Sequence, residues 1–259
     1  YVGPEASVTL LGSLILAVVL WHLIKLVSYS GKAIIDDEDD ENVLARVLQQ
    51  QAFTQTVLLC GPSGAGKTRL FYLLCHQQPN VPTVISVRAN VGFHGSVRFM
   101  DYPGHDAQLS DQVTDLILRS TENLRTVLMV DATKPLAPAA DLLFQLLQQH
   151  HQQQHRHRMS VLVACNKSDL SNAKNWRRVK IQLRTELERL LKLSSNNSTT
   201  EEKKNKSDQL WWPPNKPLVL EDAADIGLLS TSLEQDMGLK ELNDYCFQGV
   251  MPEPATTLR

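Results

Sequence analysis

Residues 61–68, Gly-Pro-Ser-Gly-Ala-Gly-Lys-Thr, have the types and spacing of a phosphate-binding loop. They match the pattern G-x-x-x-x-G-K-[ST] at every fixed position. Glycines in such a loop let successive backbone N–H groups turn toward an anion, and the N-terminus of the following helix adds partial positive charge. We expect Lys67 to reach the β- and γ-phosphates of a nucleotide and the Thr68 hydroxyl to ligate Mg²⁺. The predicted nucleotide-binding residues of this stretch are Gly61, Ser63, Gly64, Ala65, Gly66, Lys67, Thr68 and Arg69.

A second motif, Asn166-Lys167-Ser168-Asp169, indicates which base the nucleotide carries. It follows the apolar run 160–165, so it falls at the carboxyl end of a predicted strand, where ligands bind in open α/β sheets. The Asp169 carboxylate can accept two hydrogen bonds from the N1–H and N2–H₂ edge of guanine. Adenine lacks this pair of donors and would leave the carboxylate unpaired, so a polar site of this kind discriminates strongly. We expect Asn166, Lys167 and Asp169 to bind guanine in GTP.

A third motif, Asp101-x-x-Gly104, indicates metal binding and sensing of the γ-phosphate. An Asp at the end of a strand can hold the Mg²⁺ shell, and the Gly104 N–H can bond the γ-phosphate, which orders the loop while that phosphate is present. Thr83 lies between the phosphate loop and Asp101, where a second Thr would complete Mg²⁺ coordination, although Ser86 could serve instead. The predicted metal ligands are Thr68, Thr83 and Asp101.

The elements that must position these motifs alternate between strands and helices. Short apolar runs at 56–60, 126–131 and 160–165 predict buried strands, and amphipathic stretches at 136–150, 173–192 and 239–247 predict helices. The runs 83–87 and 95–100 predict two strands that pair antiparallel, and 217–221 and 227–231 predict late strands. This order predicts a three-layer α/β fold around a phosphate-binding loop, in which the sheet is mostly parallel with one antiparallel strand.

The segment Val8–Ile24 is uncharged and, extended to Val27, reaches the roughly 20 residues that a membrane-spanning helix needs. Trp21 and Tyr29 suit an aromatic belt, and Lys25 can extend to the interface. A buried core helix and a cleaved signal peptide are the alternatives. The acidic run that follows disfavours the first, and the lack of a basic start and of an A-x-A cleavage site disfavours the second. Lysines on the C-terminal flank place the rest of the chain in the cytosol.

Composition and charge set further bounds. The net charge is −2, but the acidic run 36–41 carries six of the 28 acidic residues, so the remainder is mildly basic. No basic stripe with interleaved aromatics is present, and we expect no direct binding of nucleic acid. The four cysteines have no metal-ligand spacing and suit a reducing compartment. The Gln/His tract 148–158 leaves metal binding open beside the simpler interpretation of a solvated loop.

We divide the chain into an N-terminal transmembrane anchor (1–32), an acidic linker with a short helix (33–50) and a nucleotide-binding domain (51–259). The domain carries a low-complexity insertion (194–216) that ends in tandem tryptophans, which we expect to pack back onto the domain. A membrane-tethered nucleotide kinase would have the same phosphate loop. It would also need an acceptor-binding segment and a lid with arginines, and neither is evident.

Taken in order, the signatures GPSGAGKT, DYPGH and ACNKSD, together with the N-terminal apolar segment, resemble the Ras-like small GTPases. Within them the chain resembles the β subunits of the signal recognition particle receptor. The Arf and Sar GTPases of vesicle trafficking are the alternative, but they attach through an amphipathic helix or a lipid, and no lipidation glycine is visible here.

This resemblance implies a single-pass protein of the endoplasmic reticulum membrane that docks the receptor α subunit in its GTP-bound state, with the translocon or the ribosome as further partners. It also implies that His105 stands where many GTPases carry the glutamine that orients the attacking water. Ser230 and Thr231 stand where the family backs the guanine, although the Lys of that motif is replaced by Ser232. We expect slow GTP hydrolysis by the isolated domain and leave open whether the chain acts as an enzyme or as a GTP-gated adaptor.

Overall fold

A six-stranded sheet runs through the computed structural model, which describes residues 53–78, 81–83, 88–104, 124–152, 158–196, 210–213 and 216–252. All of these belong to one compact unit, Phe53–Arg259. The strand order is β2-β3-β1-β4-β5-β6, and every neighbouring pair is parallel except β2 with β3. The strands are β1 (Gln55–Cys60), β2 (Asn90–His94), β3 (Val97–Asp101), β4 (Leu124–Asp131), β5 (Ser160–Asn166) and β6 (Asp225–Ser230).

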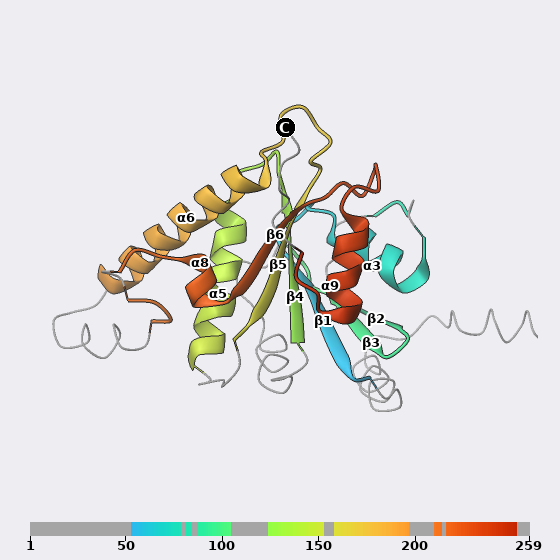
Figure 1. Ribbon diagram of the computed structural model, residues 1–259, viewed down its shortest axis with the longest axis horizontal. Coiled ribbons are helices and arrows are strands. Elements are labelled where there is room, and N and C mark those ends of the chain that lie inside the picture. The colour runs from blue at the N-terminus through green and yellow to red at the C-terminus, as the bar shows by residue number, and fades with distance from the viewer. Residues whose placement is uncertain are drawn as a thin grey trace, which may run out of the picture. The chain divides into compact units, whose positions relative to one another are not determined.

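Helices cover both faces of this sheet (Figure 1). Helices α3 (Lys67–His76) and α9 (Leu239–Gln248) pack on one face, and α5 (Ala137–Gln152), α6 (Trp176–Asn196) and the short α8 (Leu220–Ala223) pack on the other. The predicted three-layer α/β fold with one antiparallel strand is therefore confirmed for the described residues.

Strand β1 shows why the sheet is buried on both sides. Its side chains alternate between the two layers: Val57 and Leu59 join the core beside α3 and α9, whereas Leu58 and Cys60 join the core beside α5 and α6. All four are fully buried. A parallel strand with helices on both faces reads as a continuous apolar run, which is the pattern that identified this strand in the sequence.

The antiparallel partner of β3 was predicted wrongly. It is Asn90–His94, joined to β3 by the two-residue turn Gly95–Ser96, and not the run 83–87. Gly95 has φ 58, a left-handed conformation that glycine adopts without steric cost and that two-residue hairpin turns require. Thr83 lies outside the strands, and residues 84–87 lie outside the described ranges.

Two other predicted boundaries differ in the structure. Residues 220–223 form the helical turn α8 and not a strand: the Ala223 and Ala224 N–H groups donate to the carbonyls of Val219 and Leu220, four residues earlier. Leu220 is buried beside α6. Helix α6 continues to Asn196, so the first residues of the predicted insertion are helical.

The tandem tryptophans after α6 pack onto the domain, as the sequence suggested. Trp211 and Trp212 are 9% and 6% exposed and belong to the core beside α5 and α6. The ring of Trp211 meets Phe144 of α5 edge-on at 6.0 Å, and Trp212 Nε1 donates to the Lys216 carbonyl at 3.1 Å.

Several predictions fall on residues outside the described ranges. These are the anchor, the acidic linker, the short helix before Phe53, His105 and the centre of the Gln/His tract. Within the ranges that are described, no helix has both the length and the apolar character that crossing a membrane requires.

Candidate functional site

The phosphate loop joins the end of β1 to the start of α3 and is held against two other strands. Gly61 has φ 139, and a Cβ atom there would overlap the backbone carbonyl of Met129 on β4. Gly66 has φ 103, and a Cβ atom there would come within 2.5 Å of Asn166 Nδ2 at the end of β5. Both positions therefore require glycine for backbone conformation and for close approach.

Lys67 is the first residue of α3 and is only 6% exposed. Its ammonium group donates to the Pro62 carbonyl at 3.0 Å, so the side chain folds back over the loop. Burial lowers the pKa of Lys67, while the nearby Asp101 charge opposes this shift. No side chain caps the N-terminus of α3 at Gly66. A buried ammonium group and an uncapped helix N-terminus together favour an anion at this point.

Asp101 lies beside the loop at the end of β3 and is fully buried. Its Oδ2 accepts hydrogen bonds from Thr68 Oγ1 at 2.7 Å and Asn90 Nδ2 at 2.9 Å. Its Oδ1 is buried without a hydrogen-bond partner among the described residues. Burial raises the pKa of Asp101, although the hydrogen bonds from Thr68 and Asn90 and the charge of Lys67 work against this rise.

This arrangement fits a hard divalent cation. A buried carboxylate oxygen without a partner, next to a threonine hydroxyl, supplies the oxygen ligands that Mg²⁺ prefers, and a cation there would compensate the buried negative charge. Mg²⁺ usually keeps several waters and takes only one or two protein ligands beside substrate phosphates. Thr68 and Asp101 are thus brought together as predicted, and Asn90 joins them.

Gly104 also lies against the phosphate loop. A Cβ atom at Gly104 would overlap Lys67 Nζ and would come within 2.7 Å of both the Gly61 carbonyl oxygen and the Ser63 backbone nitrogen. Only glycine allows this approach of the segment after β3. Thr83, in contrast, is exposed, and within the part of the chain that the structure describes no hydrogen bond joins it to Thr68 or Asp101.

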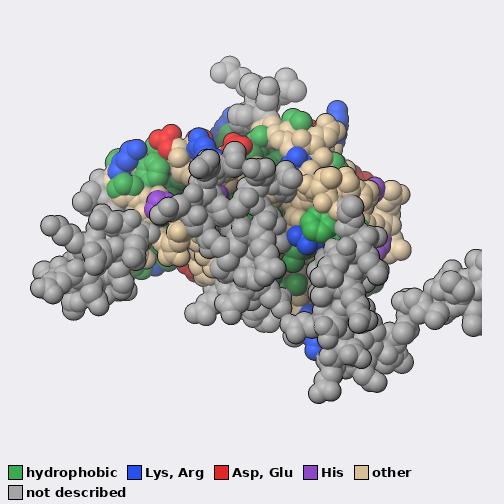
Figure 2. Space-filling view, turned by 90° about the horizontal axis from the view of Figure 1, so that it is seen from below, with side chains coloured by type: hydrophobic (Ala, Val, Ile, Leu, Met, Phe, Trp, Pro, Cys, Tyr) green, Lys and Arg blue, Asp and Glu red, His purple; other side chains and the backbone are tan. Residues whose placement is uncertain are grey.

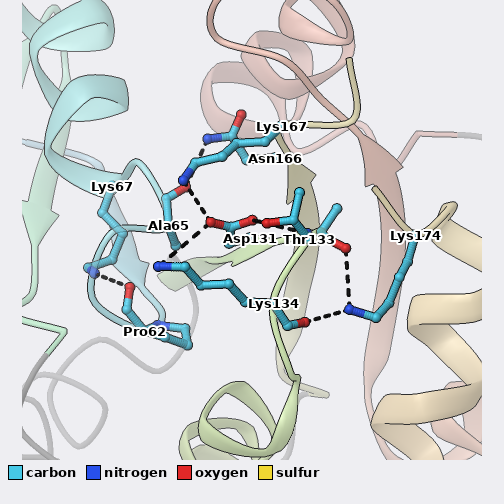
Figure 3. A network of polar contacts seen from close by, with 10 residues as sticks. Pro62, Ala65, Lys67, Asp131, Thr133, Lys134, Asn166, Lys167 and Lys174 are labelled. Carbon is cyan, nitrogen blue, oxygen red and sulfur yellow. Dashed lines mark hydrogen bonds and ion pairs between the residues drawn. The ribbon is translucent and has the colours of Figure 1, made fainter. Parts of the chain in front are cut away.

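The Asn166–Asp169 segment packs against the other side of the loop (Figure 3). Asn166 Nδ2 donates to the Ala65 carbonyl at 2.8 Å, and Asn166 Oδ1 accepts from the Leu233 backbone N–H at 3.3 Å. Asn166 is therefore a structural link between the phosphate loop and the segment after β6. Asp169 is half-buried, and its carboxylate makes no hydrogen bond or ion pair with any described residue.

Lys167 forms an ion pair with Asp131 at the end of β4, with 2.6 Å between Nζ and Oδ2. Although burial opposes ionisation of Asp131, hydrogen bonds from Lys167 and Thr133 hold its pKa below the usual value. Figure 3 shows that Lys134 points toward the same carboxylate, at 3.9 Å from Oδ2. Lys174 donates to the Lys134 carbonyl at 2.6 Å and so supports this turn.

Sequence reasoning did not include Asn90 or Asp131 in the site. Asp131 could have been found, because it ends an apolar strand and pairs in register with Asn166, and the carboxyl ends of parallel neighbours meet at one edge. Asn90 could not, because it reaches Asp101 only through the hairpin whose first strand was misplaced.

Residues 230–232 are joined to the same edge. The Ser168 N–H donates to the Thr231 carbonyl at 3.1 Å, and the Thr231 N–H donates to the Cys165 carbonyl at 2.8 Å. Thr231 Oγ1 is buried without a hydrogen-bond partner among the described residues. Ser232 Oγ accepts backbone N–H groups of Glu234 and Gln235, so its hydroxyl shapes the following turn.

The family model of the signal recognition particle receptor beta subunit matches residues 52–212, well over half of the chain. The chain belongs to this family. One receptor β subunit, from Saccharomyces cerevisiae, is 28% identical over 152 residues, which cover 56% of this chain and 61% of that protein. The match thus spans about three fifths of that relative's length.

Solved receptor β subunits share the fold. The structure of the mammalian signal recognition particle receptor has a TM-score of 0.59 at 23% identity, covering 76% of this chain and all of that one. Two structures from Chaetomium thermophilum, an SRb-GTP/SRX complex and SRb-GDP-Mg, have TM-scores of 0.50 and 0.51 at 22% and 23% identity. They cover 69% and 71% of this chain and 90% and 91% of theirs. This member of the receptor β-subunit family therefore has the α/β fold of small GTPases.

Proposed function

We propose that the chain is the GTP-binding subunit that anchors the signal recognition particle receptor in the endoplasmic reticulum membrane and docks the receptor α subunit in its GTP-bound state. Family membership supports the receptor assignment. One solved relative is described as an SRb-GTP/SRX complex and another as SRb-GDP-Mg, which supports a guanine nucleotide with Mg²⁺ as the ligand.

The observation that carries the proposal is the buried Asp101 carboxylate at the edge of the phosphate loop. One of its oxygens binds the Thr68 hydroxyl, and the other has no partner among the described residues. Thr68 and Asp101 would hold Mg²⁺, Asp101 through water, and the ion would neutralise charge on the phosphates. Thr83 would add a further ligand. Lys67 and the loop N–H groups would bind the phosphates from the other side.

The base would bind at the edge formed by Asn166–Asp169 and residues 230–231. Asp169 would accept from the guanine N1–H and N2–H₂ groups, because its carboxylate makes no bond within the described part of the chain. Asn166 would act indirectly, since its amide already joins Ala65 and Leu233. Asp131 would hold Lys167 in place along this edge.

The contact of Gly104 with the phosphate loop suggests how the nucleotide state would be communicated. Because Gly104 lies against Lys67 and Ser63, a γ-phosphate there would contact the segment after β3 directly. His105, which follows, would orient the attacking water once a partner positions it. The α subunit would bind the face that these segments form in the GTP state.

The test compares capture of the purified receptor α subunit by the chain loaded with GTP or with GDP, each with Mg²⁺. We expect retention in the GTP state alone, and Thr68→Asn should abolish it by removing an Mg²⁺ ligand. Thr185→Asn, on the exposed side of α6, is the matched control and should behave as the parent. Equal capture in both nucleotide states would refute the GTP-gated adaptor.

A further inference from the structure

The side of α6 that faces away from the sheet is basic. The helix buries Val179, Leu183, Leu187 and Leu191 at four-residue spacing, which leaves the opposite side in solvent. Over its whole length α6 carries six lysines and arginines against two glutamates. We define the α6 basic face by its exposed residues Arg178, Ile181, Arg184, Arg189, Lys192 and Leu193.

The positive charge of this face is only partly compensated. Arg189 pairs with Glu186 at 2.8 Å, and Arg184 lies 3.8 Å from Glu188. The side chains of Arg178 and Lys192 form no ion pair or hydrogen bond with any described residue. Exposed pairs of this kind contribute little to stability, so the fold does not account for the arginines.

Two exposed apolar side chains lie within the face. Ile181 is 59% exposed and stands one turn from both Arg178 and Arg184, and Leu193 is 46% exposed next to Lys192. Basic residues beside aliphatic ones suit the headgroup region of a membrane, where the cations meet anionic headgroups and the apolar groups reach the acyl boundary. Single-stranded RNA would favour aromatic stacking residues, and the face has none.

The direction of α6 places the face suitably. In the β5–α6–β6 crossover, α6 begins near the carboxyl edge of the sheet and runs away from it, past α5, so its C-terminal end lies away from the nucleotide site (Figure 1). Figure 2, seen from below, shows basic and hydrophobic side chains on the side where α6 lies, with acidic side chains beside them. Contact with a bilayer along this outer side of α6 would leave the carboxyl ends of the strands free for a partner.

We infer that the α6 basic face docks the domain against anionic phospholipid headgroups. The inference rests on the proposed function in one respect: the membrane anchor is what brings the domain close to a bilayer. Each basic residue near an anionic surface adds about 1 kcal/mol, or roughly fivefold in the ratio of docked to undocked protein. The contact is therefore reversible and weakened by salt.

The experiment places a fluorophore at Ile181→Cys in the full chain and measures its quenching by doxyl lipids in vesicles. Cys60, Cys165 and Cys246 are buried, and the unsubstituted chain reports any labelling of the half-buried Cys75. We expect quenching in phosphatidylcholine vesicles that contain phosphatidylinositol, and little in phosphatidylcholine alone or in high salt. Reversing two charges, Arg178→Glu with Arg184→Glu, should lower the docked ratio by at least about 25-fold, because each lost basic residue accounts for roughly fivefold. Lys240→Glu on α9 is the control and should change nothing.

Equal quenching in both kinds of vesicle, or quenching that survives the Arg178 and Arg184 reversal, would overturn the inference. So would an RNA duplex that shields the probe from an aqueous quencher while anionic lipid has no effect, because the face would then bind nucleic acid. Carbonate extraction of the same vesicles reports the anchor separately. If carbonate releases the full chain, the same chain is tested without membrane insertion by flotation with phosphatidylinositol vesicles. Its flotation should then be lost in the variant with Arg178→Glu and Arg184→Glu, and unchanged flotation would overturn the inference.

Discussion

At the scale of single residues, three aspartates at one edge of the sheet differ in their surroundings. Asp101 is fully buried with one oxygen lacking a partner, and burial raises its pKa. Asp131 is also buried, but hydrogen bonds from Lys167 and Thr133 outweigh that burial and lower its pKa. Asp169 is half-buried with no bond to any described residue. The first suits a cation, the second holds a lysine, and the third is available to a ligand.

Asp169→Asn tests the base contact. The amide would present a donor where the carboxylate accepts, so affinity for GTP should fall by about two orders of magnitude or more. Affinity for xanthosine triphosphate should rise, because xanthine has a carbonyl where guanine has its amino group. Competition binding with both nucleotides measures the change, and Asp222→Asn on the exposed turn of α8 is the control. Unchanged GTP affinity would remove Asp169 from the base site.

Asp101→Asn tests the metal site through stability. A carboxyl group whose folded pKa is raised binds protons more tightly in the folded state. Its contribution to stability is therefore present below about 3.9, the usual unfolded pKa, and is lost as pH rises from there through the folded pKa. Without metal, burial thus disfavours the ionised carboxylate of the parent more than the hydrogen bonds and Lys67 favour it, and the neutral amide of the variant avoids this cost. We expect the metal-free variant to melt no lower than the parent, and about 2–4 °C higher for each kcal/mol recovered. Mg²⁺ with GDP should raise the melting temperature of the parent only.

The control for this prediction has the opposite sign. The pKa of Asp131 is lowered in the folded state, so its ionised form stabilises the protein above the unfolded pKa, and this contribution disappears as pH falls through the folded value. Asp131→Asn should thus lower the melting temperature at pH 7 and respond less to acid. A loss of stability in both variants would mean that Asp101 is stabilised in the apo protein and does not await a cation.

At the scale of elements, the segment after α6 is fastened to the domain by its tryptophans. Trp211 contacts Phe144 of α5, and Trp212 packs in the same core with Lys216 Nζ 4.6 Å from its ring centroid. Indole rings bury a large apolar area, so Trp211 and Trp212 hold the end of the polar insertion against the core beside α5 and α6. The turn α8 then leads the chain into β6 at the edge of the sheet.

Trp212→Ala should therefore destabilise the domain by about 3–5 kcal/mol, because a large buried side chain is removed and the cavity closes only partly. Equilibrium denaturation in urea measures the change in free energy of unfolding. Val250→Ala, at a 54% exposed position, is the control and should stay within about 0.5 kcal/mol of the parent. A similarly small effect at Trp212 would show that its burial contributes little.

At the scale of the whole molecule, the proposed function gives the domain and the N-terminal segment separate tasks. Among the described residues, the buried apolar side chains lie between Val57 and Cys246, in the unit Phe53–Arg259. The apolar segment Val8–Val27 is long enough to cross a bilayer as a helix. The domain would then stay at the membrane in both nucleotide states. Only the conformation of the segment after β3, which begins with Gly104, would change with the nucleotide.

Carbonate extraction of membranes that contain the full chain tests the anchor. We expect the chain to remain in the membrane pellet, with the GTPase domain open to protease from the cytosolic side. A chain that starts at residue 42 should be soluble and should still bind GTP, because the site is assembled from later segments. Release of the full chain by carbonate would show that the apolar segment only lies on the surface.

The local parts of this protein were determined by its sequence alone. The phosphate loop, the Asn166–Asp169 segment and strands β1, β4 and β5 were found because glycine spacing and apolar runs act over a few residues. Only the tertiary structure decided that Asn90 reaches Asp101, that Asp131 holds Lys167 and that residues 220–223 turn as a helix. These depend on hairpin register, on strand order and on burial against a distant helix. Such contacts join residues whose separation along the chain carries no periodic signal, so no local pattern specifies them.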